Sequence, residues 1–282
     1  MNMCFTFYLF CSCLLFLSAC SPVSDKKQPQ TLKVSIWSQG QPLACKGFYD
    51  RQGHFWDIQQ LALFVSNLSL KQGQQSYALS LLPSDWQSSD IALIRPYLPE
   101  CDSIVPAHQG ASEQYNSSLG FVSQISLADA DSLSFELSVP FALNHQNPLT
   151  QPSPLNLSSM FWSWRSGHKF FRMDLQSTQG SWAFHLGSVG CEAASSVRGP
   201  STPCKQPNRL VFDLPLTFDL QKDKSDKNEQ KPQGRELVLH LDLLLEDIEI
   251  ESTSSCLFHG SAADSCAKLL SNMQSNQIFE WY

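Results

Sequence analysis

Histidine and tryptophan side chains are concentrated between Val139 and Cys191, which hold three of the seven histidines and three of the seven tryptophans. His145 follows a Pro-rich segment, and His185 lies in an alternating run that ends at Leu186. Imidazole ligates borderline metals such as copper, especially where thiols are committed to disulfides. His145 and His185 are therefore candidate metal ligands. Taken alone, however, each is more often a hydrogen-bonded surface or core residue.

Two tryptophans occur two residues apart in the segment Phe161-Trp162-Ser163-Trp164. In an extended chain, residues i and i+2 point to the same side, so Trp162 and Trp164 would form one aromatic face. Such a face suits a core or edge pair whose indole N–H groups need partners. It also suits stacking on a carbohydrate, and the pair alone does not decide between these interpretations.

Several function classes lack their usual motifs in this sequence. Gly187-Ser188-Val189-Gly190 does not have the Gly-x-Ser-x-Gly spacing, and neither His-Glu-x-x-His nor a phosphate-binding glycine loop is found. The net charge of −7 argues against a nucleic-acid partner. We expect a protein that is not an enzyme.

The ten cysteines divide into a leader set and a mature set. Cys4, Cys11 and Cys13 precede Cys20, and six cysteines follow it. An even number in an exported chain predicts disulfides, and six cysteines allow 15 connectivities. Short loops favour Cys191–Cys204 and Cys256–Cys266, which leaves Cys45–Cys101. No C-x₂-C pair is present, which argues against a structural zinc site.

The N-terminus predicts export. The first 24 residues carry no charged side chain, and residues 1–19 have the length of a signal peptide rather than of a membrane span. Leu17-Ser18-Ala19-Cys20 resembles a bacterial lipobox, although the usual basic residue before the apolar run is missing. We predict lipidation at Cys20 and a flexible tether over 20–31. Ser21 favours the outer membrane of a Gram-negative bacterium and its periplasmic face. A signal cleaved without lipidation, or a short anchor, is the alternative.

Period-two alternation dominates the rest of the chain, and Pro and Gly separate many of the runs. We predict an all-β fold, a single β-sandwich or barrel-like domain over 32–282 with long loops, disulfide staples and a short C-terminal helix. His240 is predicted to face solvent, and 222–235 to be a charged loop. The predicted strands are 32–36, 61–70, 77–82, 91–94, 119–127, 133–139, 168–175, 181–186, 209–214 and 236–245, and the helix is 264–273.

The order of short motifs resembles the MbnP-like copper-binding family, also described as the four-Cys-motif half of the metallo-mystery pair. The resemblance covers nearly the whole mature chain, and four cysteines, Cys191, Cys204, Cys256 and Cys266, would be the name-giving set. The motifs are Val139 to His145, Pro154 to Asn156, Met160 to Trp164, Gly167 to Asp174, His185 to Cys191, and Cys204-x-x-Pro207-Asn208, with weaker echoes at Ala44-Cys45 and Leu63 to Asn67.

This resemblance implies a copper-binding protein with His145 and His185 as ligands. It also implies a di-haem partner, related to MauG and bacterial cytochrome c peroxidases, that oxidises Trp164 or Trp162 to kynurenine. The opened ring would offer a ketone and an aniline amine as potential metal ligands.

His168 stands where the family is expected to have tyrosine, so it is either a third ligand or a polar substitute. Arg172 and Asp174 alternate onto one face, where they would support the structure or hydrogen-bond a ligating histidine. The alternative function is a lipoprotein without metal, either structural or binding a saccharide or hydrophobic ligand through Trp162, Trp164 and Trp182.

Overall fold

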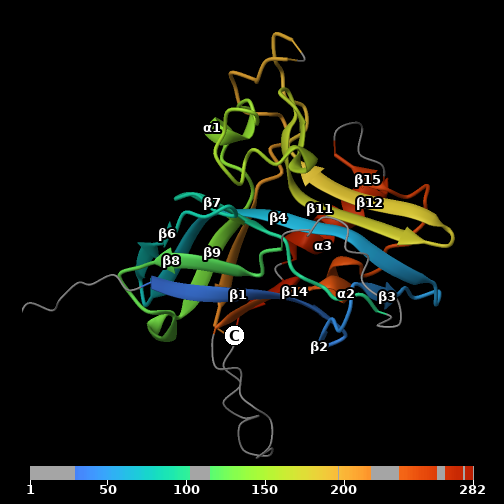
Figure 1. Ribbon diagram of the computed structural model, residues 1–282, viewed down its shortest axis with the longest axis horizontal. Coiled ribbons are helices and arrows are strands. Elements are labelled where there is room, and N and C mark those ends of the chain that lie inside the picture. The colour runs from blue at the N-terminus through green and yellow to red at the C-terminus, as the bar shows by residue number, and fades with distance from the viewer. Residues whose placement is uncertain are drawn as a thin grey trace, which may run out of the picture.

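The protein is described by a computed structural model over residues 29–101, 115–195, 197–216, 235–258, 264–275 and 277–281 (Figure 1). Most of the elements are strands, and they form two sheets. The smaller sheet has the order β16-β14-β1-β8-β6, with β2 paired to β1. Its strands are β1 (Pro29–Ser38), β2 (Gln41–Pro42), β6 (Ser80–Leu81), β8 (Ser118–Val122), β14 (Glu236–His240) and β16 (Phe279–Trp281).

The larger sheet has the order β13-β9-β4-β11-β12-β15, with β10 paired to β11 and with β3, β5 and β7 paired to β4. Its strands are β3 (Gly47–Tyr49), β4 (Phe55–Gln72), β5 (Gln75–Ala78), β7 (Ile91–Ile94), β9 (Ser132–Leu137), β10 (Phe161–Ser163), β11 (Gly167–Ser177), β12 (Gly180–Gly187), β13 (Leu210–Pro215) and β15 (Cys256–Leu257). The helices and short helical turns between the strands are α1 (Phe141–Asn144), α2 (Leu241–Leu244), α3 (Asp264–Gln274), η1 (Leu127–Asp129) and η2 (Ser158–Met160).

The long strand β4 gives the larger sheet its curl. One edge of β4 pairs first with β11, up to Leu63, and then with β9 from Val65 onward, and the β9 pairing has a register irregularity between Ser66 and Ser69. Asn67 lies at this irregularity with φ +51°, a left-handed conformation that asparagine tolerates better than most residues. The strand therefore changes direction, and in Figure 1 it passes from β9 to β11 and β12.

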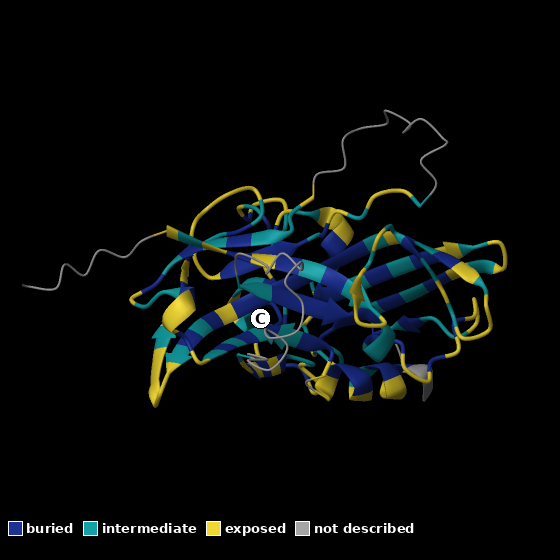
Figure 2. Ribbon diagram, turned by 90° about the horizontal axis from the view of Figure 1, so that it is seen from below, coloured by how far each residue is buried: buried dark blue, intermediate teal, exposed yellow. Residues whose placement is uncertain are grey.

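The main core lies between the two sheets. Strands such as β9 and β13 alternate buried with less buried residues, as expected for strands that face a core on one side. Phe279 of the smaller sheet contacts Phe135 and Phe212 of the larger one, with ring centroids 5.2 and 4.8 Å away. Full burial of each phenylalanine stabilises the fold by about 2 kcal/mol. Figure 2 shows the buried residues along the inner strands and the exposed ones at turns and edges.

A second, smaller cluster holds the segment 139–160 against the outer face of β4, β7 and β11. Phe64 of β4 and Phe170 of β11 are fully buried there under Val139, Leu155 and Met160. In Figure 1 this segment, with α1, rises above the sheets. The cluster fixes the position of His145, which directly follows α1.

The predicted all-β, disulfide-stapled fold with a short C-terminal helix is confirmed. Some strand predictions were wrong in extent. The run 77–82 is divided between β5, which ends at Ala78 in the larger sheet, and β6 in the smaller sheet. The run 119–127 contains β8 only to Val122 and then η1. The run 236–245 contains β14 only to His240, because the paired strands β1 and β16 offer no register partner beyond it, and the chain turns into α2.

His240 is also corrected, since it is buried rather than solvent-facing. Its ring lies beside Trp37, and its Nε2 is 3.1 Å from a carboxylate oxygen of Glu280.

Some predicted segments fall outside the described residues. The signal segment 1–19 and the lipidation site Cys20 do so, as does the charged loop 222–235 except for Arg235. The last three residues of the predicted tether, 29–31, instead belong to β1. None of the helices in the described ranges combines the length and apolar character needed to cross a bilayer.

Candidate metal site

Three disulfides join the six cysteines of the described residues in the pairing that short loops favour: Cys45–Cys101, Cys191–Cys204 and Cys256–Cys266. The second of these lies just beyond β12. The chain around Cys204 is held there independently, since Val189 and Gln206 form a β-bridge and Asn208 Nδ2 donates to Gly187 O at 2.8 Å. These contacts explain the Cys204-x-x-Pro207-Asn208 motif, which brings this disulfide beside the end of the strand that carries His185.

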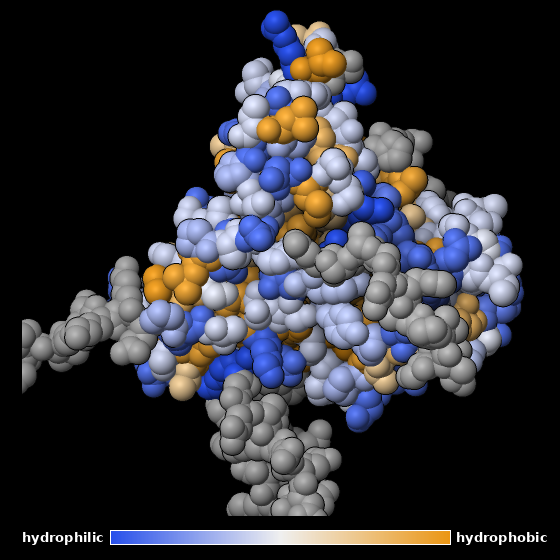
Figure 3. Space-filling model, in the orientation of Figure 1, coloured by the Kyte–Doolittle hydropathy of each residue, from blue (hydrophilic) through white to orange (hydrophobic). Residues whose placement is uncertain are grey.

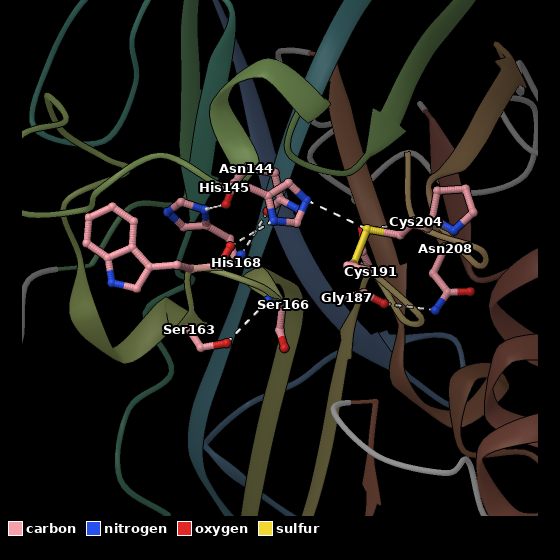
Figure 4. Close-up of a disulfide and its surroundings, with 12 residues drawn as sticks. Asn144, His145, Ser163, Ser166, His168, Gly187, Cys191, Cys204 and Asn208 are labelled. Carbon is pink, nitrogen blue, oxygen red and sulfur yellow. Dashed lines mark hydrogen bonds between the residues drawn. A yellow bond between two sulfur atoms is a disulfide. The ribbon is translucent and has the colours of Figure 1, made fainter. Parts of the chain in front are cut away.

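His145 is buried between this disulfide and the turn after β10. Its Nδ1 is 3.2 Å from the carbonyl oxygen of Trp164, and its Nε2 is 3.7 Å from Cys204 Sγ and 3.2 Å from Asn144 Nδ2 (Figure 4). A carbonyl oxygen only accepts, so the N–H is on Nδ1 and the lone pair is on Nε2. That lone pair accepts from the amide of Asn144 and faces the sulfur.

His168 is fully buried, with a carbonyl oxygen facing each ring nitrogen, and the neutral imidazole donates its single N–H to one of the two. Its Nδ1 and Nε2 lie 3.0 Å from the carbonyl oxygens of Asn144 and Leu155, and its backbone N–H donates to Asn144 Oδ1 at 2.7 Å. The rings of Phe161 and Phe64 pack edge-on against it. His168 therefore ties the segment that carries His145 to β11. A metal at either nitrogen would have to replace one of these carbonyl contacts.

His185 lies on the outer face of β12, opposite Trp182, Phe184 and Leu186, which are buried in the main core. Its Nε2 contacts Asp174 Oδ1 at 2.5 Å, and Asp174 also accepts from Arg172 Nε at 2.8 Å. The predicted common face of Arg172 and Asp174, with a carboxylate bonded to a histidine, is confirmed. Ligands of metals are commonly oriented by such a carboxylate.

Trp162 lies in β10 and Trp164 in the turn that follows it, so the predicted extended pair is wrong, because β10 ends at Ser163. Trp162 packs over Gly187, where an added Cβ would lie 2.5 Å from its ring. Its ring centroid is 6.0 Å from Lys169 Nζ. Trp162 thus belongs to the face of His185, whereas Trp164 contacts His145 through its backbone.

The pKa values of the three histidines are all lowered, in each case chiefly by burial. For His145 and His168 the carbonyl contacts oppose the shift, and for His185 the bond to Asp174 opposes it. For Asp174 itself, burial acts to raise the pKa, but the bonds and charges of His185 and Arg172 outweigh burial and lower it. Neutral imidazoles are the form that binds metals.

The sequence patterns did not identify two residues that the structure places beside the candidate site. Asn144 is buried, and its amide bridges His168 and His145; the Asn-His dipeptide was the available signal. Lys169 is buried beside Trp162 and donates to Ser159 O at 2.7 Å. The pKa of Lys169 is lowered to about 8, mainly by burial and secondly by the nearby charge of Arg172. No sequence signal separates it from an ordinary strand lysine.

One group of potential ligands is compact. His145, Cys191 and Cys204 bring their ligand atoms within 4.8 Å of one another, and this group could hold a metal. The two sulfurs are bonded to each other in the structure, so His145 alone presents a free ligand atom. His185 lies in no such group within the described ranges, and it shares no hydrogen-bond partner with His145.

These features define a class: a disulfide-crosslinked β-protein with orienting contacts around two imidazoles at the base of a loop cluster, which is formed by residues 139–160, 164–166, 188–195 and 197–208 at the top of Figure 1. The family model MbnP matches residues 27–258, and the chain belongs to this family. Among solved structures, MbnP from Methylosinus trichosporium is similar in fold, with a TM-score of 0.60 and 19% sequence identity, covering 85% of this chain and 83% of that chain. No curated protein matches the sequence.

Proposed function

We propose that this protein binds copper through His145 and His185, and that it is not a turnover enzyme. The observation that carries the proposal is that each imidazole has one nitrogen anchored by an acceptor. His145 Nδ1 meets the carbonyl oxygen of Trp164, and His185 Nε2 meets Asp174. Anchoring of this kind fixes the tautomer and direction of a ligand histidine. Family membership supports copper as the metal.

The donor chemistry fits copper. Both imidazoles have lowered pKa values and are neutral at physiological pH. A metal at His145 Nε2 would replace the hydrogen bond from Asn144, whereas His185 Nδ1 makes no hydrogen bond among the residues described. His168 is left out of the ligand set because both its nitrogens already meet carbonyl oxygens.

We further propose that Trp162 or Trp164 is converted to kynurenine by a di-haem partner protein. The hairpin supports this because the indole of Trp162 lies over Gly187, on the strand of His185, and the backbone carbonyl of Trp164 contacts His145. A ketone and an aniline amine formed there would add donors beside the imidazoles. Leu149 and Val197, which flank this region in sequence, are 88% and 67% exposed, and Figure 3 shows apolar patches on the loop cluster at the top that suit contact with a partner.

Lipidation at Cys20 and attachment to the outer membrane complete the proposal. Three disulfides fit an oxidising compartment such as the periplasm.

Copper titration of the oxidised, full mature chain tests the ligand set. We expect His145→Ala and His185→Ala each to weaken binding at least tenfold, while His54→Ala, a partly exposed histidine bonded to Asp50, leaves it unchanged. Binding that survives both ligand substitutions would exclude this site.

Peptide mass spectrometry of protein from its own host tests the tryptophan. A peptide over 162–164 that has gained one oxygen and lost one carbon would identify kynurenine. Trp182, buried in the main core, is the internal control and should remain unmodified. Unmodified Trp162 and Trp164 in every copy would leave a site built from histidine alone.

A further inference from the structure

Among the described residues, the disulfide Cys191–Cys204 differs from the other two in having an imidazole beside it. His145 Nε2 is 3.7 Å from Cys204 Sγ, and Figure 4 shows the ring directed at the sulfur. Around Cys45–Cys101 and Cys256–Cys266, the structure gathers no comparable group of ligands within its described ranges. Cys256 and Cys266 are instead buried in the main core. The feature is therefore specific to the loop cluster.

The spacing matches a metal site with thiolate ligands. A tetrahedral ion with metal–sulfur bonds of about 2.3 Å and metal–nitrogen bonds of about 2.0–2.1 Å separates a sulfur and a nitrogen ligand by about 3.6 Å. The observed 3.7 Å between Nε2 and Sγ is close to this value. The lone pair on Nε2 already points to the correct side, because the N–H on Nδ1 is held by Trp164 O. The sulfur–sulfur separation would have to increase, and the metal would replace the hydrogen bond from Asn144 Nδ2 to Nε2.

We propose that reduction of Cys191–Cys204 converts this group into a Cys₂His site for a thiophilic metal ion such as Zn²⁺. A dithiol reductant transfers two electrons and two protons: its thiols become a disulfide, and the Cys191–Cys204 bond is replaced by two thiols. The metal then displaces one proton from each thiol and binds two thiolates and the neutral imidazole. A fourth position stays open to water or another ligand. This site uses His145 but not His185, and so goes beyond the copper site proposed above.

Contacts around the disulfide hold both ends of the loop after the bond opens. Val189 N–H donates to Gln206 O at 2.8 Å, and Gln206 N–H donates to Val189 O at 3.0 Å. Ser188 Oγ donates to Pro207 O at 3.1 Å. The described residues between the two cysteines are mostly exposed, so the loop can widen without disturbing a core. The two thiols therefore remain near His145.

The test is titration of the full mature chain with Co²⁺ and then Zn²⁺, before and after reduction and anaerobic removal of the reductant. We expect a thiolate-to-cobalt charge-transfer band only after reduction, at one ion per chain, which Zn²⁺ removes. His145→Ala should weaken binding at least tenfold. Cys191→Ser/Cys204→Ser should abolish the band. Cys45→Ser/Cys101→Ser, treated identically, should keep it.

The outcomes separate this site from the copper site. His185→Ala should weaken copper binding to oxidised protein and leave cobalt binding to reduced protein unchanged. A band that persists in Cys191→Ser/Cys204→Ser, or that ignores His145→Ala, would overturn the proposal. So would a reduced protein that binds no cobalt or that loses its β-sheet circular dichroism, because the site requires the fold to survive reduction.

Discussion

His145 and His185 are held by different kinds of structure. His185 is part of a regular strand, and its partners Asp174 and Arg172 lie on the adjacent strand β11, within one antiparallel ladder. His145 lies in a loop, and its surroundings come from the hairpin turn, the Cys191–Cys204 disulfide and Asn144. A ladder tolerates the loss of one side chain because its backbone bonds remain. The loop depends on side-chain contacts, so we expect it to be the more sensitive region.

The largest effect is expected at the link between the two regions. His168→Ala removes the ring that lies between the carbonyl oxygens of Asn144 and Leu155 and opens a cavity beside Phe64 and Phe161. We expect a loss of about 4 kcal/mol in the free energy of unfolding, measured by chemical denaturation. The partly exposed control, His54→Ala, should cost far less. Equal losses in the two variants would show that His168 does not hold the loop.

A smaller loss is expected where the hairpin rests on β12. Gly187→Ala would place a Cβ 2.5 Å from Trp162 and 2.8 Å from the carbonyl oxygen of His168. The backbone atom cannot move as a side chain can, so we expect about 2 kcal/mol of destabilisation and a changed environment for Trp162. Denaturation and tryptophan fluorescence measure the two effects. Gly120→Ala, whose nearest side-chain atoms are 3.6 Å away, is the matched control.

Replacing the carboxylate of Asp174 tests whether it orients His185, because asparagine has nearly the same shape as aspartate but no charge. Asp174→Asn removes the charge that orients His185 and pairs with Arg172. Copper affinity should fall about 10-fold to 100-fold, with a smaller change in folding stability. Asp213→Asn, at an exposed ion pair with Lys71, should leave affinity unchanged. If both substitutions behave alike, Asp174 does not position a ligand.

The smallest expected effect is the dependence of folding stability on pH. Burial lowers the pKa values of His145, His168 and His185 below 6.5, so the unfolded chain binds more protons than the folded one as pH falls below 6.5. Stability is therefore complete above this value and declines until pH passes the folded pKa values. Unfolding measured from about pH 8 to about pH 5 should show the decline, and replacing His185 by Gln should reduce its slope. A slope that His185→Gln leaves unchanged would contradict the contribution of this residue.

Much of the fold could be predicted from local pattern. Alternation located most of the strands because one face of each is buried, and the loop lengths favoured the observed cysteine pairing. Alternation wrongly extended the strand beyond His240, where the pairing ends and the chain turns into α2. It also failed at Trp164, which lies in a turn rather than in β10. Both failures occur where neighbouring strands, rather than the local sequence, decide where a strand ends.

By itself, the sequence determined which residues of most strands face inward, which cysteines close short loops and which ordered motifs mark the family. Only the tertiary structure decided that His145 lies against Cys204, 59 residues later in the chain, and that Asn144 joins His168 to His145. Periodicity specifies the face of a strand, but it contains no information on which distant loop covers that face. That choice depends on the curl of β4 and on the small cluster around Phe64 and Phe170, which exist only in the folded chain.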